Sequence, residues 1–124
     1  MKDENRKNQS VETQETQSLD AAIAAPEYHK IVFENERVRV TDFRVKPGEI
    51  VPAHTHRWAS VNYVLSLSDF LSYDGDGNLK LDSRTGKSDI KQGAVFCLPP
   101  LPPPHSVENI GESEIHAVSV ELKD

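Results

Sequence analysis

The sequence has little cysteine, no long apolar run and no cluster of basic residues. Its 124 residues include one cysteine, Cys97, which excludes an internal disulfide and a cysteine-based zinc site. No apolar run approaches the length of a membrane span, and the polar N-terminus lacks the apolar core of a signal peptide. A formal net charge of −6 disfavours nucleic acid and anionic membrane surfaces as partners. These absences predict a cytoplasmic protein that binds neither nucleic acid nor membranes.

The chain divides into a polar segment over residues 1–25 and one domain over residues 26–124. Only Met1, Val11 and Leu19 are apolar among the first twenty residues, too few to offset the entropy lost on ordering. We therefore expect a disordered tail, with a short helical turn before Pro26. The remaining length suits a single domain.

From Glu27 onward, short segments rich in Val, Ile, Phe and Tyr alternate with turns rich in Gly, Pro and Asp. Closely and evenly spaced short strands are typical of a sandwich or a barrel, so we predict an all-β fold, a single small antiparallel β-barrel. The expected strands are His29–Glu34, Val38–Val45, Val51–His56, Ser60–Leu67, Asp69–Tyr73, Leu79–Asp82, Ser88–Lys91, Ala94–Leu98, His105–Asn109 and Ile115–Leu122.

The strongest local signal for chemistry is His54-Thr55-His56. Residues two apart on a strand share a face, so two imidazoles can reach one metal ion from a single strand. A lone pair of this kind is a weak signal. The third histidine, His105, follows a proline-rich run over residues 99–104, whose fixed backbone angles predict a rigid start to a strand.

These residues resemble the two motifs of the cupin family. Gly48, five residues and His54-Thr55-His56 match the first motif; Gly93, Pro100, His105, three residues and Asn109 match the second. The resemblance covers Ile31 to Leu122 and extends to small stand-alone cupins of unassigned function, which share the ENERVRV opening at Glu34–Val40. It implies a cupin or jelly-roll barrel, His54, His56 and His105 as metal ligands, and a homodimer.

The sequence departs from the cupin motifs where the family has a carboxylate ligand, because Ser60 stands in place of the Glu. Leu67 and Pro102 also replace motif glycines. The implied site is three neutral imidazoles, a set that suits Zn, Fe, Ni or Cu. Some cupin oxygenases, such as cysteine dioxygenase and acetylacetone dioxygenase, hold Fe(II) with three histidines. The alternative is a barrel without metal, in which the histidines bind a ligand directly.

Other residues are candidates for the wall of a substrate pocket. Asn62 shares a strand face with Ser60, Trp58 follows the histidine pair, and Phe96 belongs to the apolar wall. His116 shares parity with Val118, Val120 and Leu122, which predicts that it faces inward as a core or pocket residue. His29 is expected to be peripheral.

Two functions follow from these observations. The first is a metal-binding cupin that acts on or binds a small molecule in its barrel, with an Fe(II)-dependent dioxygenase as one form. The second is a non-enzymatic module that binds or senses a small molecule without a functional metal, which the missing Glu favours. A third hypothesis, a structural barrel with a filled interior, depends on the side chains between the histidines.

Overall fold

The computed structural model describes residues 19–86 and 90–124. These residues form one short helix and nine strands, and every strand pair is antiparallel. The elements are α2 (Ala21–Ala24), β1 (His29–Glu34), β2 (Val38–Val45), β3 (Ile50–His56), β4 (Ser60–Ser66), β5 (Phe70–Asp74), β6 (Leu79–Asp82), β7 (Val95–Leu98), β8 (Leu101–Asn109) and β9 (Ile115–Leu122).

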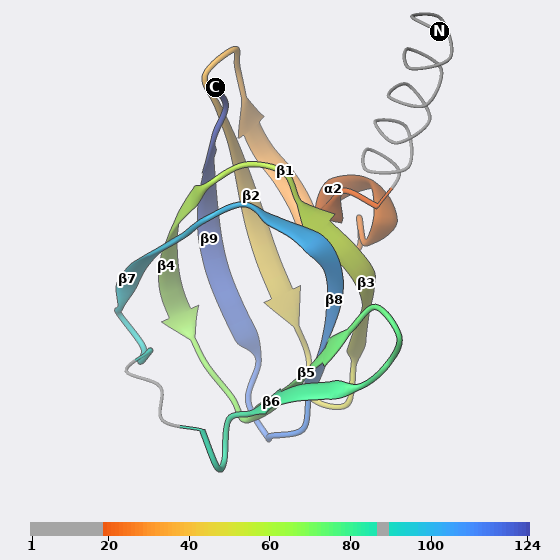
Figure 1. Cartoon of the computed structure of the whole chain (residues 1–124). Helices are drawn as coiled ribbons and strands as arrows, with labels where there is room; N and C mark the ends of the chain where they lie inside the picture. Colours follow the sequence, from red (N-terminus) through yellow and green to blue (C-terminus); the bar gives the residue numbers. More distant parts are fainter. Residues whose placement is uncertain (1–18, 87–89) are drawn as a thin grey trace, which may run out of the picture.

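The strands form two sheets that face each other (Figure 1). One sheet has five strands in the order β1-β2-β9-β4-β7, and the other has four in the order β3-β8-β5-β6. The predicted all-β jelly-roll is confirmed. In the described part of the chain, however, the strands pair as two separate sheets rather than as one closed hydrogen-bonded cylinder. The interior is therefore the space between two sheets.

Most predicted strands are present to within one residue at each end. The exceptions are β8, which begins earlier than predicted, and the strand expected over residues 88–91. Ile90 and Lys91 are outside any strand, while Ser88 and Asp89 lie outside the described residues. Three glycines have a positive φ, which a side chain would strain: Gly48 (85°), Gly77 (86°) and Gly93 (84°).

β8 begins before the prolines that precede His105, because its first residue, Leu101, already pairs with β3. In the pairing of β3 with β8, His54 lies opposite His105 and His56 lies opposite Leu101. Three residues of β8, Pro102, Pro103 and Pro104, thus lie opposite the single residue Thr55, so β8 has two extra residues here. Proline has no N–H to donate to a ladder, so it is tolerated at such a bulge. The pairing with β5 begins at His105, after the prolines.

Part of the expected N-terminal tail is packed into the domain. Ala25 joins Val45, Val51 and Ile115 in the buried core cluster, and Ala21 is fully buried. Asp20 caps α2 by accepting a hydrogen bond from the Ala22 N–H at 3.0 Å. The boundary expected at Pro26 is therefore corrected: residues 19–25 belong to the packed unit, whereas residues 1–18 lie outside the described residues.

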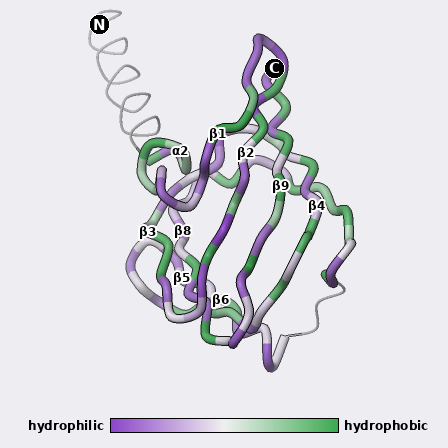
Figure 2. The backbone as a smooth tube through the Cα atoms, turned by 180° about the vertical axis from the view of Figure 1, so that it is seen from behind, coloured by the Kyte–Doolittle hydropathy of each residue, from purple (hydrophilic) through white to green (hydrophobic). Residues whose placement is uncertain are grey.

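Hydropathy varies along the strands of the five-stranded sheet (Figure 2). Hydrophobic and hydrophilic stretches alternate along β2, β9 and β4 (Figure 2). Such alternation is typical of strands with one face packed and one solvated. No helix in the described residues is long and apolar enough to cross a bilayer.

Candidate metal centre and cavity

The strands β1 and β3 both contact α2 (Figure 1). Four imidazole rings gather in this part of the molecule. His54 and His56 share a face of β3, and His105 on β8 is the Cα partner of His54. His29 begins β1, in the other sheet. The distances between ring centroids are 4.5 Å (His54–His105), 4.6 Å (His29–His54), 5.0 Å (His54–His56), 5.1 Å (His56–His105) and 5.7 Å (His29–His56).

The structure brings the three predicted histidines together and adds a fourth. His29 was expected to be peripheral, and this is wrong, since its side chain is 5% exposed and contacts two of the other rings. The ligand atoms of His29, His54 and His56 all lie within 4.8 Å of one another. No local pattern marks His29, because its position depends on how the two sheets face each other.

Backbone carbonyls hold three of the rings in place through Nδ1. Nδ1 of His54 lies 2.7 Å from the Pro52 carbonyl, Nδ1 of His29 lies 3.1 Å from that of Ala25, and Nδ1 of His105 lies 3.4 Å from that of Pro103. A carbonyl oxygen only accepts, so each Nδ1 carries the proton and donates it. Nε2 is then the nitrogen with a free lone pair, the arrangement found in metal-binding histidines.

The cluster is electrically neutral at pH 7. Burial, together with a smaller effect of the neighbouring histidines, lowers the pKa of His29 to about 3, that of His54 to about 4 and that of His56 to about 2. Burial also lowers the pKa of His105. Metal ions bind the neutral imidazole, so no proton has to be displaced from these rings.

The donor set fits a divalent transition metal. Imidazoles alone, with no thiolate or carboxylate in the group, suit Zn, Cu, Fe and Ni better than Mg or Ca. Around a tetrahedral ion with bonds of about 2.0 Å, ligand nitrogens are about 3.3 Å apart. The ligand atoms, which lie within 4.8 Å of one another, would therefore move closer together by up to about 1.5 Å around such an ion. Ligation by His54, His56 and His105 remains a prediction.

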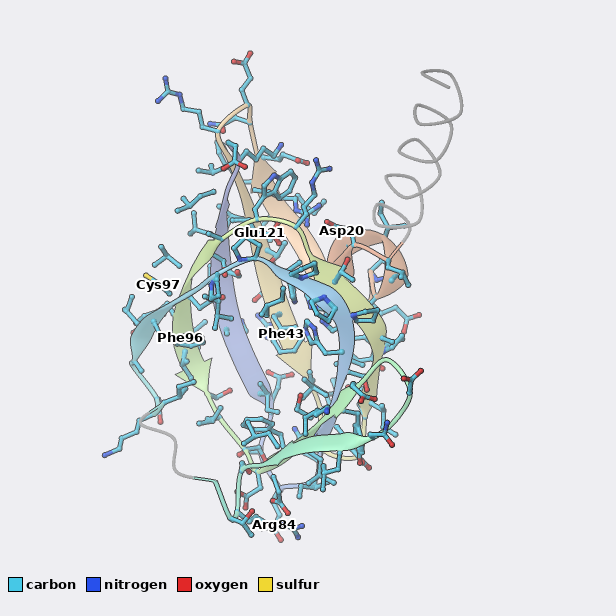
Figure 3. All side chains as sticks on the ribbon, viewed as in Figure 1. Asp20, Phe43, Arg84, Phe96, Cys97 and Glu121 are labelled. Atoms are coloured by element: carbon cyan, nitrogen blue, oxygen red, sulfur yellow. The ribbon has the colours of Figure 1, made fainter. Side chains whose placement is uncertain are left out.

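A cavity of about 410 Å³ opens beside the histidines, between the two sheets. All four imidazole rings line this cavity. The rest of its wall is mainly apolar and includes Phe43, which is labelled in Figure 3. The other lining residues are Thr41, Ser60, Asn62, Val64, Ser66, Leu67, Phe70, Ser72, Leu81, Ile90, Phe96, Leu98, Pro99, Leu101, Val107, Ile115, Ala117 and Ser119. The interior beside the histidines is therefore open. The structural-barrel hypothesis requires a filled interior, so this cavity argues against it.

Three of the five predicted pocket residues line the cavity: Ser60, Asn62 and Phe96. Asn62 Nδ2 donates a hydrogen bond of 3.0 Å to Ser60 Oγ, so the residue in place of the family's Glu is held by its neighbour. No Asp, Glu, Lys or Arg is among the described residues that line the cavity.

Trp58 does not line the cavity. Its ring instead receives the guanidinium groups of Arg57 and Arg39, at 4.6 and 5.0 Å from the ring centroid, and the Lys123 ammonium at 5.4 Å. Such cation–π contacts stabilise an aromatic ring at a partly exposed position. The Trp58 ring therefore packs against basic side chains instead of lining the cavity.

His116 also lies outside the cavity, and the prediction that it faces inward is wrong. Its neighbours Ile115 and Ala117 line the cavity, so the alternation of β9 places His116 on the opposite face. There its Nε2 contacts Asp42 Oδ1. The sequence was ambiguous because both faces of β9 carry apolar residues.

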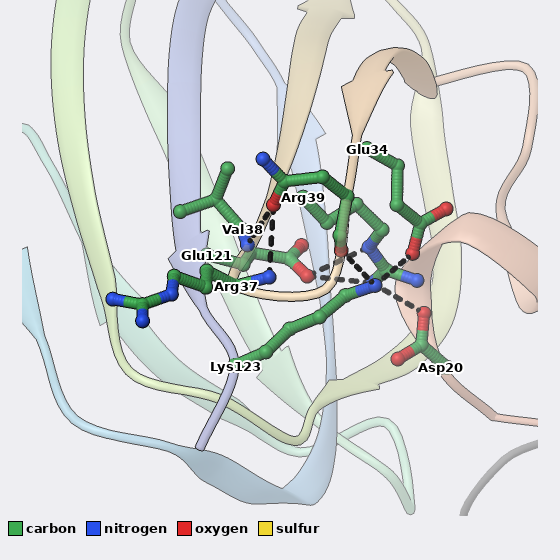
Figure 4. Close-up of polar contacts among 8 residues, drawn as sticks. Asp20, Glu34, Arg37, Val38, Arg39, Glu121 and Lys123 are labelled. Atoms are coloured by element: carbon green, nitrogen blue, oxygen red, sulfur yellow. Dashed lines mark hydrogen bonds and ion pairs between the residues drawn. The ribbon is translucent and has the colours of Figure 1, made fainter.

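A second buried polar group adjoins the histidines and is formed by Arg39, Asp20 and Glu121 (Figure 4). Arg39 Nη2 lies 2.7 Å from Asp20 Oδ1 and 2.7 Å from Glu121 Oε2, and Arg39 Nε donates to the same Glu121 oxygen at 2.8 Å. Burial raises the pKa of Glu121, and Arg39 opposes this rise. This ion cluster ties the start of the packed chain to β2 and β9.

Comparison with known proteins defines the fold. No protein-family model matches the sequence, and no curated protein matches it. The chain superposes on a cupin domain from Bordetella pertussis Tohama I with a TM-score of 0.62 and 24% identity, over 77% of this chain and 92% of that chain. An RmlC-like cupin with a double-stranded β-helix fold from Methanocaldococcus jannaschii gives a TM-score of 0.54 and 14% identity, over 77% and 78% of the two chains. This chain has the cupin fold.

An enzyme also shares this cupin fold. The polyketide cyclase RemF from Streptomyces resistomycificus matches with a TM-score of 0.51 and 20% identity, over 77% of this chain and 64% of that chain. At these identities the likeness extends to the fold alone, and one fold hosts many functions. The function of this chain has to be argued from its own histidines and cavity.

Proposed function

We propose that this cupin binds a divalent transition metal at His54, His56 and His105 and holds a small molecule against it in the cavity. The observation that carries the proposal is that the neutral imidazoles line the same cavity as the apolar wall. A bound metal would supply a Lewis acid or, as Fe(II), a redox centre for chemistry with dioxygen. The chain itself supplies the fixed imidazoles, the polar pair Ser60 and Asn62, and a wall that excludes water.

The lining supports a neutral, largely apolar small molecule as the ligand. Burying a charged group without a partner is costly, and no charged side chain lines the described cavity to compensate an ionised carboxylate or ammonium. A volume of about 410 Å³ is in the range of small-molecule sites. Ser60 and Asn62 can offer hydrogen bonds to one polar end of the molecule, while Phe43, Phe96 and Val107 contact the rest.

A binding or sensing module without turnover is the second candidate function. It is favoured because, apart from the histidines, no Asp, Glu, Lys, Tyr or Cys side chain lines the described cavity. Such groups perform most general acid–base catalysis. A reaction in this cavity would therefore depend on the metal for activation.

The test of the proposal is the metal content of untagged protein, measured by elemental analysis before and after anaerobic reconstitution with Fe(II) or Zn(II). We expect close to one metal ion per chain in the wild type, loss of it in the double variant His54→Ala/His56→Ala, and retention in His116→Ala. A wild type that takes up no metal would overturn the proposal. Oxygen consumption by the Fe(II) form with neutral apolar compounds would separate an enzyme from a binding module.

A homodimer and a cytoplasmic location are further proposals, and binding of nucleic acid or membranes is not expected. The dimer rests on the resemblance to cupins. Light scattering of the full chain at micromolar concentration should give twice the 13.9 kDa mass of the chain. A monomer mass across the concentration range would contradict it.

A further inference from the structure

His29 stands out on its own strand. It is the only buried residue of β1, and the other five are exposed. A histidine is a costly choice for such a position, because both ring nitrogens lose water on burial. One nitrogen, Nδ1, is compensated by the Ala25 carbonyl at 3.1 Å. The other, Nε2, is not used by that carbonyl, and the ring lines the cavity.

The surroundings of His29 fix the orientation of its ring. The ring lies between Phe43, with centroids 4.8 Å apart, and His54, with centroids 4.6 Å apart. The Ala25 carbonyl accepts from both the Nδ1 and the backbone N–H of His29. A ring held by two neighbouring rings and through one nitrogen loses little further entropy when its second nitrogen binds a metal.

The motif site lacks one protein ligand, and His29 lies next to that site. Ser60 leaves that site without its fourth protein ligand, and a hydroxyl is a poor substitute for a carboxylate. Among the described residues, the group of side chains that could hold a metal contains no carboxylate. His29 reaches the same point from the opposite sheet, with its ligand atom within 4.8 Å of those of His54 and His56.

We propose that His29 is a fourth imidazole ligand, so that the metal is held by four histidines from three strands. The inference rests on the proposed function, since it requires that His54, His56 and His105 bind a metal. Its consequence is that the metal links the two sheets, because His29 belongs to one and the other ligands to its partner. A tetrahedral ion would be fully coordinated by the chain, whereas a six-coordinate ion would keep two positions for a ligand.

The test uses Co(II) as the probe, in wild type, His29→Gln and His116→Gln. Competition with a chromophoric chelator gives the dissociation constant, and the visible absorption of Co(II) reports the coordination. We expect His29→Gln to weaken Co(II) binding by at least about tenfold and to change the visible bands, while His116→Gln leaves both unchanged.

The outcomes separate this inference from the proposed function. Equal affinity and identical bands in wild type and His29→Gln would overturn the role of His29 and leave the three-histidine site standing. A wild type that binds no Co(II) would overturn both. If His29→Gln does not fold, the Co(II)-loaded wild type gives the answer by NMR: four strongly shifted, exchangeable imidazole N–H protons are expected, and three would contradict the inference.

Discussion

Two buried polar clusters lie side by side in this protein, and they differ in how much of their hydrogen bonding is completed within the chain. In the ion cluster, Arg39 is paired with both Asp20 and Glu121, and all three side chains are less than one-tenth exposed. In the histidine cluster, three rings use Nδ1 on a carbonyl and keep the lone pair of Nε2. Both clusters are costly to bury. The ion cluster is closed apart from Asp20 Oδ2, which is buried without a hydrogen-bond partner, whereas each of these three histidines keeps a nitrogen for a ligand.

The two clusters also influence each other. Besides the dominant effect of burial, Arg39 lowers the pKa of His29 and His56, and Asp20 raises that of His54. Leu19, beside Asp20, accepts a hydrogen bond of 2.7 Å from the N–H of Thr55, the residue between the two β3 histidines. The closed cluster therefore fixes the backbone that carries the open one, which is how a rigid scaffold supports a binding site.

The largest expected effect is acid destabilisation through the histidine cluster. The folded pKa values of His29, His54 and His56, at about 3, 4 and 2, lie below the ordinary value of 6.5. The unfolded chain then binds more protons below pH 6.5, so stability is present above that pH and is lost as the pH falls. Between pH 7 and pH 5, the contribution of each of the three histidines to the free energy of unfolding should fall by about 2 kcal/mol.

Urea unfolding of metal-free protein in this pH window measures the loss. Most carboxylates stay ionised down to pH 5, so the window isolates the histidines. His29→Gln should show a shallower loss than the wild type. A free energy of unfolding that stays flat from pH 7 to pH 5 would contradict burial of the rings as neutral groups.

Breaking the closed cluster should be the next largest effect. Arg39→Met keeps much of the side-chain volume but leaves Asp20 and Glu121 buried without their cation. We expect a loss of about 3–5 kcal/mol in the free energy of unfolding. Arg37→Met, two residues away on an exposed position, is the matched control, with an expected change within about 0.5 kcal/mol. Equal losses in the two variants would mean that the ion cluster is not structural.

A smaller effect is expected when only one charge of the ion cluster is removed. Asp20→Asn keeps an N-cap residue for α2 and leaves Arg39 paired with Glu121, so the loss should be about 2 kcal/mol. Asp20→Ala removes the cap as well and should lose about 1 kcal/mol more. Thermal and urea unfolding of both variants separate the two contributions. Identical stability of the Asp20→Asn and Asp20→Ala variants would show that the cap contributes nothing.

The smallest effect is expected on the outer face of the five-stranded sheet. His116 and Asp42 are partly exposed there, and pairs of this kind contribute about 0–1 kcal/mol. His116→Ala should therefore change the free energy of unfolding by less than about 1 kcal/mol and leave metal affinity unchanged. A loss of metal in this variant, read by elemental analysis, would mean that the fifth histidine belongs to the site.

The features that were predictable from the sequence are those set by short-range patterns. Period-two alternation and turn residues located the strands. The resemblance to the cupin motifs implied that His54, His56 and His105 lie together, and they lie on the paired strands β3 and β8. Asn109, matched by the same motif, is fully buried and donates to the Val45 and Ser113 carbonyls, both at 2.8 Å. Each of these follows from local geometry or from the motif.

The features that were missed depend on contacts between distant segments. His29 joins the cluster only because β1 packs near β3, which no local pattern encodes. The packing of residues 19–25 was missed because Ala21 and Ala25 bury little area, and so add little to local hydrophobicity. His116 was placed on the wrong face because β9 is apolar on both sides, so parity alone could not choose.

The central claim is that the buried histidines are neutral, tied at Nδ1, and free to bind a metal through Nε2. Long-range ¹H–¹⁵N NMR of the imidazole rings at pH 7, recorded without metal and with one equivalent of Zn(II), tests it directly. We predict the Nδ1–H tautomer for His29, His54 and His105 without metal, and a shift of Nε2 to the metal-bound range on addition of Zn(II), with His116 unchanged. Protonated rings in the metal-free protein, or ring nitrogens that do not respond to Zn(II), would contradict the claim.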